Sequence, residues 1–91
     1  MVAAVHITVH GRVQGVWFRA GAKEKAEELG LTGWVMNRPN STVEIHAQGD
    51  KSQLENFIAW CRQGTPAAKV TSLDIDRSPI QQGFISFDIH P

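Results

Sequence analysis

The feature that most constrains the fold is a change in apolar spacing near the start of the chain. Between residues 5 and 10 apolar and polar residues alternate, a period of two that predicts a half-buried strand. Gly11 and Gly15 interrupt this pattern, and the apolar spacing then becomes helical up to Gly30. The apolar face of the expected helix is formed by Phe18, Ala22, Ala26 and Leu29. The chain therefore begins with a strand, a glycine-containing turn and an amphipathic helix.

Further strands are predicted by the same alternation. Residues 32–37 and 43–49 are expected to pair as a hairpin through the polar turn at 38–41. Leu73 and Ile75 indicate a fourth strand, with Asp74 and Asp76 on its solvent-exposed face. A short final strand is indicated by Ile85, Phe87 and Ile89.

A second helix lies between the third and fourth strands. Asp50 is a good N-cap, and Gln53 occupies the capping-box position three residues later. Gly64 and Pro66 end the helix. Its apolar stripe has the spacing i, i+3, i+4, i+7 and consists of Leu54, Phe57, Ile58 and Cys61.

This order of elements predicts an α+β fold, the ferredoxin-like split βαβ sandwich. The pattern is βαββαβ plus a short final strand, an antiparallel sheet with two helices on one face. We expect the other face to be exposed to water, and residues 1–91 to form a single domain. This fold hosts many unrelated activities, so it does not identify a function.

Composition limits the partners that the chain can attract. Nine basic and nine acidic residues cancel, so no overall field draws in nucleic acid or an acidic membrane. The single cysteine, Cys61, allows no intramolecular disulfide, and no apolar stretch is long enough to span a bilayer. His6, His10 and Arg12 interrupt any apolar run resembling a signal peptide. We expect a cytoplasmic monomer without nucleic-acid or membrane partners, whose anion recognition is local.

The segment 11–19 has the features of a phosphate site. Glycines let successive N–H groups point inward as a nest, and the first helical turn adds free donors and partial positive charge. Arg19 in that turn opposes the helix dipole, which is reasonable if an anion lies between the guanidinium and the amides. The residues alone leave open the alternative of a surface arginine beside an ordinary turn.

Two motifs resemble those of the acylphosphatase family. Residues 11–19 read Gly-Arg-Val-Gln-Gly-Val-Trp-Phe-Arg and fit G-x-V-Q-G-V-x-[FM]-R at every specified position. The segment Gly33-Trp34-Val35-Met36-Asn37, followed by Thr42-Val43-Glu44 and Gly49, is similar to the second motif. Phe87-Asp88-Ile89 resembles the closing strand of the family, so the resemblance covers essentially the whole chain.

The resemblance implies a hydrolase of small acyl phosphates that uses no cofactor and no metal. Arg19 and Asn37 would be the catalytic residues: Arg19 holds the phosphate and Asn37 orients an attacking water. Inorganic phosphate or sulfate would bind in the same loop. The substrate-binding groups implied by position are Gly15, Val16, Trp17, Phe18 and Arg19.

Three residues depart from the family pattern. Trp17 is bulky where relatives often have a small residue, and it could narrow the phosphate cradle or stack on a substrate. Arg38 stands where threonine is frequent, and is either an added positive charge or a solvated turn residue. Ser41 stands where glycine is usual, so we expect the hairpin turn to use another backbone geometry.

Three alternatives compete with the enzyme. The same motifs would suit a phosphate-binding module without turnover, and the fold class includes RNA-binding domains, which normally carry a basic surface and exposed aromatic residues. His6, His10 and His46 could share the exposed sheet face, but no carboxylate or cysteine completes a recognisable metal-ligand set around them.

Overall fold

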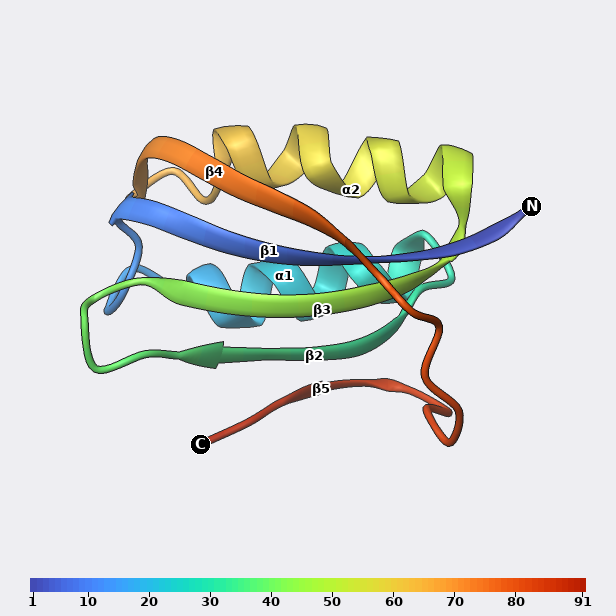
Figure 1. Cartoon of the computed structure of the whole chain (residues 1–91). Coiled ribbons are helices and arrows are strands. Elements are labelled where there is room, and N and C mark those ends of the chain that lie inside the picture. Colours follow the sequence, from blue (N-terminus) through green and yellow to red (C-terminus); the bar gives the residue numbers. More distant parts are fainter.

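The computed structural model describes all 91 residues and contains seven elements. The five strands form one sheet in the order β4-β1-β3-β2-β5, and Figure 1 shows both helices on one of its faces. The predicted α+β, ferredoxin-like arrangement is confirmed. No helix is long and apolar enough to cross a membrane. The elements are β1 (Val2–Arg12), α1 (Phe18–Glu28), β2 (Thr32–Asn37), β3 (Val43–Asp50), α2 (Lys51–Gln63), β4 (Lys69–Ser78) and β5 (Phe87–Ile89).

The core lies between the sheet and the two helices, where the two apolar periodicities meet. Strand β1 buries alternate residues, as the period of two predicts. Helix α1 buries Phe18, Ala22 and Ala26, which lie on its predicted apolar face. Helix α2 buries Leu54, Phe57 and Cys61. Burial raises the pKa of the Cys61 thiol, so this cysteine behaves as a small apolar core residue.

The final strand corrects the prediction of a wholly antiparallel sheet. Strands β1 to β4 pair antiparallel, but β5 pairs parallel to β2. The reason is a chain reversal over residues 79–86, which carries the chain from the β4 edge to the β2 edge in the opposite direction (Figure 1). Phe87 is buried on β5, whereas Ile85 lies outside the strand and is 94% exposed. The predicted strand was therefore too long at its start.

The face opposite the helices is less exposed than predicted. His46 on β3 is only 2% exposed, because Phe84 lies against its ring at 5.3 Å between centroids. Trp34 stacks on His46 and, more closely, on His90 at 5.4 Å. The segment 79–86 is further held where the Gln48 side chain donates a hydrogen bond to the carbonyl of Gln81. The crossing that carries the chain to β5 thus covers part of this face.

The β2–β3 hairpin turn corrects the expectation for Ser41. Its φ is +71°, so Ser41 adopts the left-handed conformation that a glycine would take, and the turn does not use another geometry. This conformation costs a non-glycine residue about 1–2 kcal/mol. The turn is supported by hydrogen bonds from the Ser41 amide to the Arg38 carbonyl and from the Thr42 hydroxyl to Asn40.

Candidate active site

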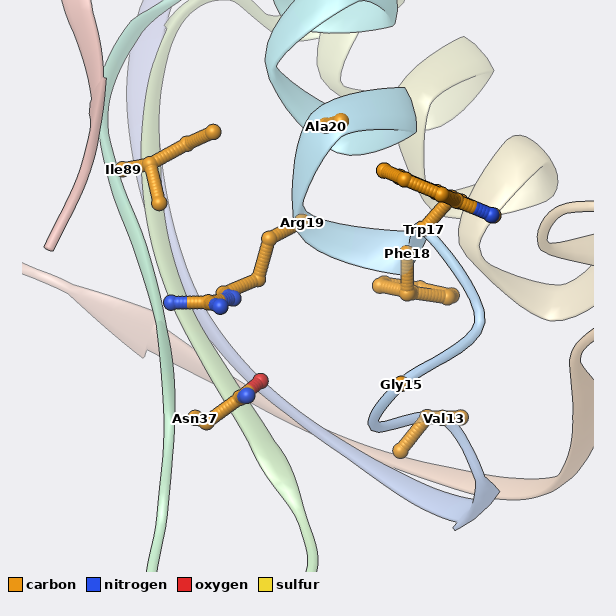
Figure 2. Close-up of a pocket in the computed structure, with 8 residues that line it drawn as sticks. All are labelled: Val13, Gly15, Trp17, Phe18, Arg19, Ala20, Asn37 and Ile89. Carbon is orange, nitrogen blue, oxygen red and sulfur yellow. The ribbon is translucent and has the colours of Figure 1, made fainter. Parts of the chain in front are cut away.

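A pocket of about 320 Å³ lies where the β1–α1 loop and the first turn of α1 approach the end of β2. Figure 2 shows Arg19 between Asn37 on one side and Trp17 and Ala20 on the other. Both predicted catalytic residues thus meet in one cavity, although they lie on different elements. Eight residues line it: Val13, Gly15, Trp17, Phe18, Arg19, Ala20, Asn37 and Ile89.

The loop before α1 presents a run of backbone amides without acceptors. Gly15 and Trp17 both have positive φ, at +74° and +67°, which turns the backbone sharply ahead of the helix. No amide from Gly15 to Arg19 donates a hydrogen bond within the protein. The helix dipole adds partial positive charge here, and α1 has neither a side-chain cap nor an acidic residue in its first turn. The loop therefore has the donors and the charge that an anion requires.

Two side chains outside the predicted set of site residues fix this loop. The Gln14 amide donates to the Arg38 carbonyl at 2.8 Å and to the Thr42 carbonyl at 2.9 Å, which ties the loop to the turn that follows β2. The Thr65 hydroxyl donates to the Val16 carbonyl at 2.7 Å. Gln14 is a specified position of the first motif, which was the available signal for it, whereas Thr65 had none, since its partner is 49 positions away.

Arg19 carries an unneutralised charge at the mouth of the loop. Its side chain is half-buried, and its Nη1 donates to the carbonyl of His90 at 3.3 Å. None of the ion pairs of the protein involves Arg19. A guanidinium with one hydrogen bond to a neutral carbonyl keeps most of its donors available to a ligand.

Asn37, the last residue of β2, contributes an unpaired polar atom. Its Oδ1 is buried and has no hydrogen-bond partner. Leaving such an acceptor unpaired costs about 1–3 kcal/mol, so its presence calls for an explanation. Figure 2 shows the amide group directed toward Arg19 and the pocket. A ligand or water that enters the pocket is the simplest source of the missing donor.

The other polar residues singled out from the sequence belong to interactions outside the pocket. Arg38 does not line the cavity; it lies 3.5 Å from Glu44 in an ion pair, and His6 binds the same carboxylate at 2.6 Å. His10 pairs with Asp74, and His46 bonds to Gln48. No group of three or more histidine, cysteine, aspartate or glutamate side chains could hold a metal ion. Trp34 packs on the opposite sheet face and does not line the pocket.

Comparisons with known proteins agree in both sequence and structure. Residues 5–89 match the acylphosphatase family model. An acylphosphatase of Methylococcus capsulatus is 51% identical over 85 residues, which span 93% of this chain and 92% of that protein. The crystal structure of the acylphosphatase from Bacillus subtilis has a TM-score of 0.94 and 37% identity, with 100% of both chains covered. The structure of an acylphosphatase from Coxiella burnetii has a TM-score of 0.93 and 35% identity, over 98% of this chain and 93% of the other.

Proposed function

This chain belongs to the acylphosphatase family of hydrolases, and we propose that the pocket between Arg19 and Asn37 is where it splits the carboxyl–phosphate bond of small acyl phosphates. The observation that carries the proposal is the pairing of an uncompensated guanidinium with a buried, unpaired amide oxygen beside a run of free amides. Each of these features is costly or unhelpful for folding, and each is useful to a reaction at a phosphate group.

The phosphate group of the substrate binds in the loop. The amides of Gly15, Val16, Trp17, Phe18 and Arg19 donate to its oxygens, and the Arg19 guanidinium adds a two-pronged, charge-assisted contact. Inorganic phosphate or sulfate occupies the same place. These donors face charge that is spread over three phosphate oxygens in the transition state, where fixed dipoles are most effective.

Asn37 holds the attacking water. Its Oδ1 accepts a hydrogen bond from the water, which leaves a lone pair of the water oxygen directed at phosphorus. The new oxygen–phosphorus bond forms as the bond from phosphorus to the acyl oxygen breaks, and the carboxylate leaves with that bond's electron pair. An amide is not a base at neutral pH, so the water's proton passes to a phosphate oxygen. The products are a carboxylate and inorganic phosphate.

The reaction needs no metal, because the charge that a cation would supply is already provided by the guanidinium and the amides. The test is release of phosphate from benzoyl phosphate by purified protein after exhaustive dialysis against EDTA, with a phosphomonoester as the control substrate. We expect hydrolysis of the acyl phosphate alone. Activity that requires added Mg²⁺ or Zn²⁺, or equal hydrolysis of both substrates, would contradict this mechanism.

The proposal extends to the state of the protein. One hydrophobic core of 17 buried residues supports a single domain over residues 1–91. The free thiol of Cys61 is buried among core residues and needs no oxidising compartment, which supports a cytoplasmic location. We further propose that the protein acts as a monomer, since the groups assigned above suffice for the reaction without a second copy. Sedimentation of the purified protein tests the last point.

A further inference from the structure

The pocket is larger than a phosphate group requires, and most of the residues that line it are apolar. Its volume of about 320 Å³ is at the lower end of the range for small-molecule sites, about 300–1,000 Å³. Its polar groups are the side chains of Arg19 and Asn37 and the loop amides. The wall on the other side of Arg19 from Asn37 includes Trp17 and Ala20 (Figure 2), and Ile89 of β5 also lines the cavity.

Trp17 is an unusual residue for its place in the backbone. It is the N-cap of α1 with φ +67°, a conformation that glycine adopts without cost and that costs other residues about 1–2 kcal/mol. Its side chain makes no capping hydrogen bond, and the residue is 80% exposed. The indole therefore gains no packing in the core and no hydrogen bond that would offset the backbone strain, and it remains largely in contact with water. A strained, exposed aromatic residue beside a reactive site indicates a contact with a ligand.

The direction of the reaction places the acyl group against this wall. In phosphoryl transfer the attacking and leaving oxygens lie roughly in line on opposite sides of phosphorus. With water held at Asn37 and phosphorus near Arg19, the leaving carboxylate lies on the side away from Asn37. Figure 2 shows Trp17 and Ala20 on that side, with the nitrogen of the indole directed away from Arg19. The substrate's acyl chain thus meets carbon rather than polar atoms.

We propose that Trp17, Ala20 and Ile89 form an acyl subsite that selects acyl phosphates with an apolar acyl chain over acetyl phosphate. This inference rests on the function proposed above and adds the substrate class. Ile89 is 40% exposed, so an acyl chain that covers it removes apolar surface from water.

The test compares acetyl phosphate with hexanoyl phosphate, two substrates with chemically similar leaving groups. Full burial of one methylene is worth about 4-fold, so a half-open subsite should favour hexanoyl phosphate by about 10-fold in kcat/KM. Because both substrates use the same phosphate cradle, general damage from a substitution cancels in this ratio. Trp17→Ala should lower the ratio about 3-fold or more, and Ile89→Ala should lower it less.

Control variants separate the indole from the shape of the loop. Trp17→Gly removes the indole and also relieves the backbone strain, so it should lower the ratio as much as Trp17→Ala. Ile85→Ala changes a residue that is 94% exposed and outside the pocket, and it should leave the ratio unchanged. A wild-type ratio near one, or a ratio that Trp17→Ala leaves unchanged, would overturn the acyl subsite while leaving the enzyme intact. Failure to hydrolyse either substrate would instead contradict the proposed function.

Discussion

The N-terminus of helix α2 is closed, because a side chain of the protein accepts a hydrogen bond from its free amides, whereas the N-terminus of helix α1 is open and has no such acceptor. Both helices carry a cation in the first turn. At α2, Asp50 has extended backbone geometry, and its carboxylate accepts a hydrogen bond from the Ser52 amide at 3.2 Å. At α1, Trp17 is left-handed and provides no side-chain acceptor. The free backbone amides at the N-terminus of each helix need hydrogen-bond acceptors. The difference shows which N-terminus is satisfied by the chain itself, and under the proposed function the other one is satisfied by an anion from solution.

Removal of the first-turn cation should have very different consequences at the two helices. Arg19→Ala should lower kcat/KM for benzoyl phosphate by about 10³-fold, because it removes charge-assisted donors from the phosphate in ground and transition states alike. Arg19→Lys should recover little, since a point charge does not reproduce the planar fork. Lys51→Ala, at the first position of α2, is the matched control and should retain wild-type kinetics. Similar losses in the two alanine variants would remove the distinction between the helices.

Asn37 lines the same pocket as the open N-terminus of α1, and α2 has no corresponding residue. Asn37→Ala should lower kcat about 10²-fold or more while affinity for inorganic phosphate stays nearly the same, because the amide contacts the water rather than the phosphate. The melting temperature should not fall, since the buried Oδ1 makes no hydrogen bond that the protein would lose. Calorimetry with phosphate, a hydrolysis assay and a thermal melt give the three values. A folded variant with near-normal turnover would exclude the water-positioning role.

Saturation with phosphate should stabilise the protein through α1 alone. At a hundred times the dissociation constant, binding adds about 2.7 kcal/mol to the free energy of unfolding. Trp17→Asp gives α1 a carboxylate at its N-cap, as α2 already has, and should weaken phosphate binding about 5-fold or more relative to the neutral Trp17→Asn. Thermal melts of both variants over a range of phosphate concentrations measure the difference. Equal phosphate shifts in the two variants would indicate that the anion binds elsewhere.

The stabilisation that Asp50 provides at the closed N-terminus of α2 should be lost in acid. Hydrogen bonding to Ser52, and then to the N-terminal ammonium group, lowers the pKa of Asp50 below its ordinary value. Because the folded pKa is the lower one, this stabilisation is present above the unfolded pKa of about 4 and is lost as the pH falls through the folded pKa. The melting temperature of Asp50→Asn should therefore lie below wild type at pH 7, and the gap should close below about pH 4. Glu55→Gln, an exposed change on the same helix, should show no such gap.

The fold was predictable to the extent that it depends on local spacing. The apolar stripes of both helices and the alternation in β1 follow from residue order, and the structure confirms them. The direction of β5 could not be predicted, because the residues of a three-residue strand do not indicate which edge of the sheet it joins or in which direction it runs. The burial of His46 was not predicted, for a related reason. A period of two assigns a residue to one face of the sheet, but it does not indicate which later segment of the chain covers that face.

The site was predicted unevenly. Physics drew attention to Arg19, since a cation in the first turn of a helix opposes the dipole unless an anion lies nearby, but only the family resemblance separated it from an ordinary surface arginine. Asn37 came from resemblance alone, because an asparagine at a strand end has no distinctive pattern. The left-handed conformation of Ser41 was missed because the identity of the residue argued against it. Its cost is accepted where hydrogen bonds within the turn hold the backbone in place.

The sequence by itself determined the order of elements, the two helical faces and a glycine-containing turn suited to an anion, since each depends on residues within a few positions of one another. Tertiary structure decided which groups share the pocket. It brought Asn37 to Arg19, placed the carbonyl of His90 and the side chain of Ile89 beside them through the parallel strand β5, and left the amides before α1 without acceptors. Such long-range juxtapositions depend on how the helices and the sheet bury their apolar faces together, and no local pattern encodes them.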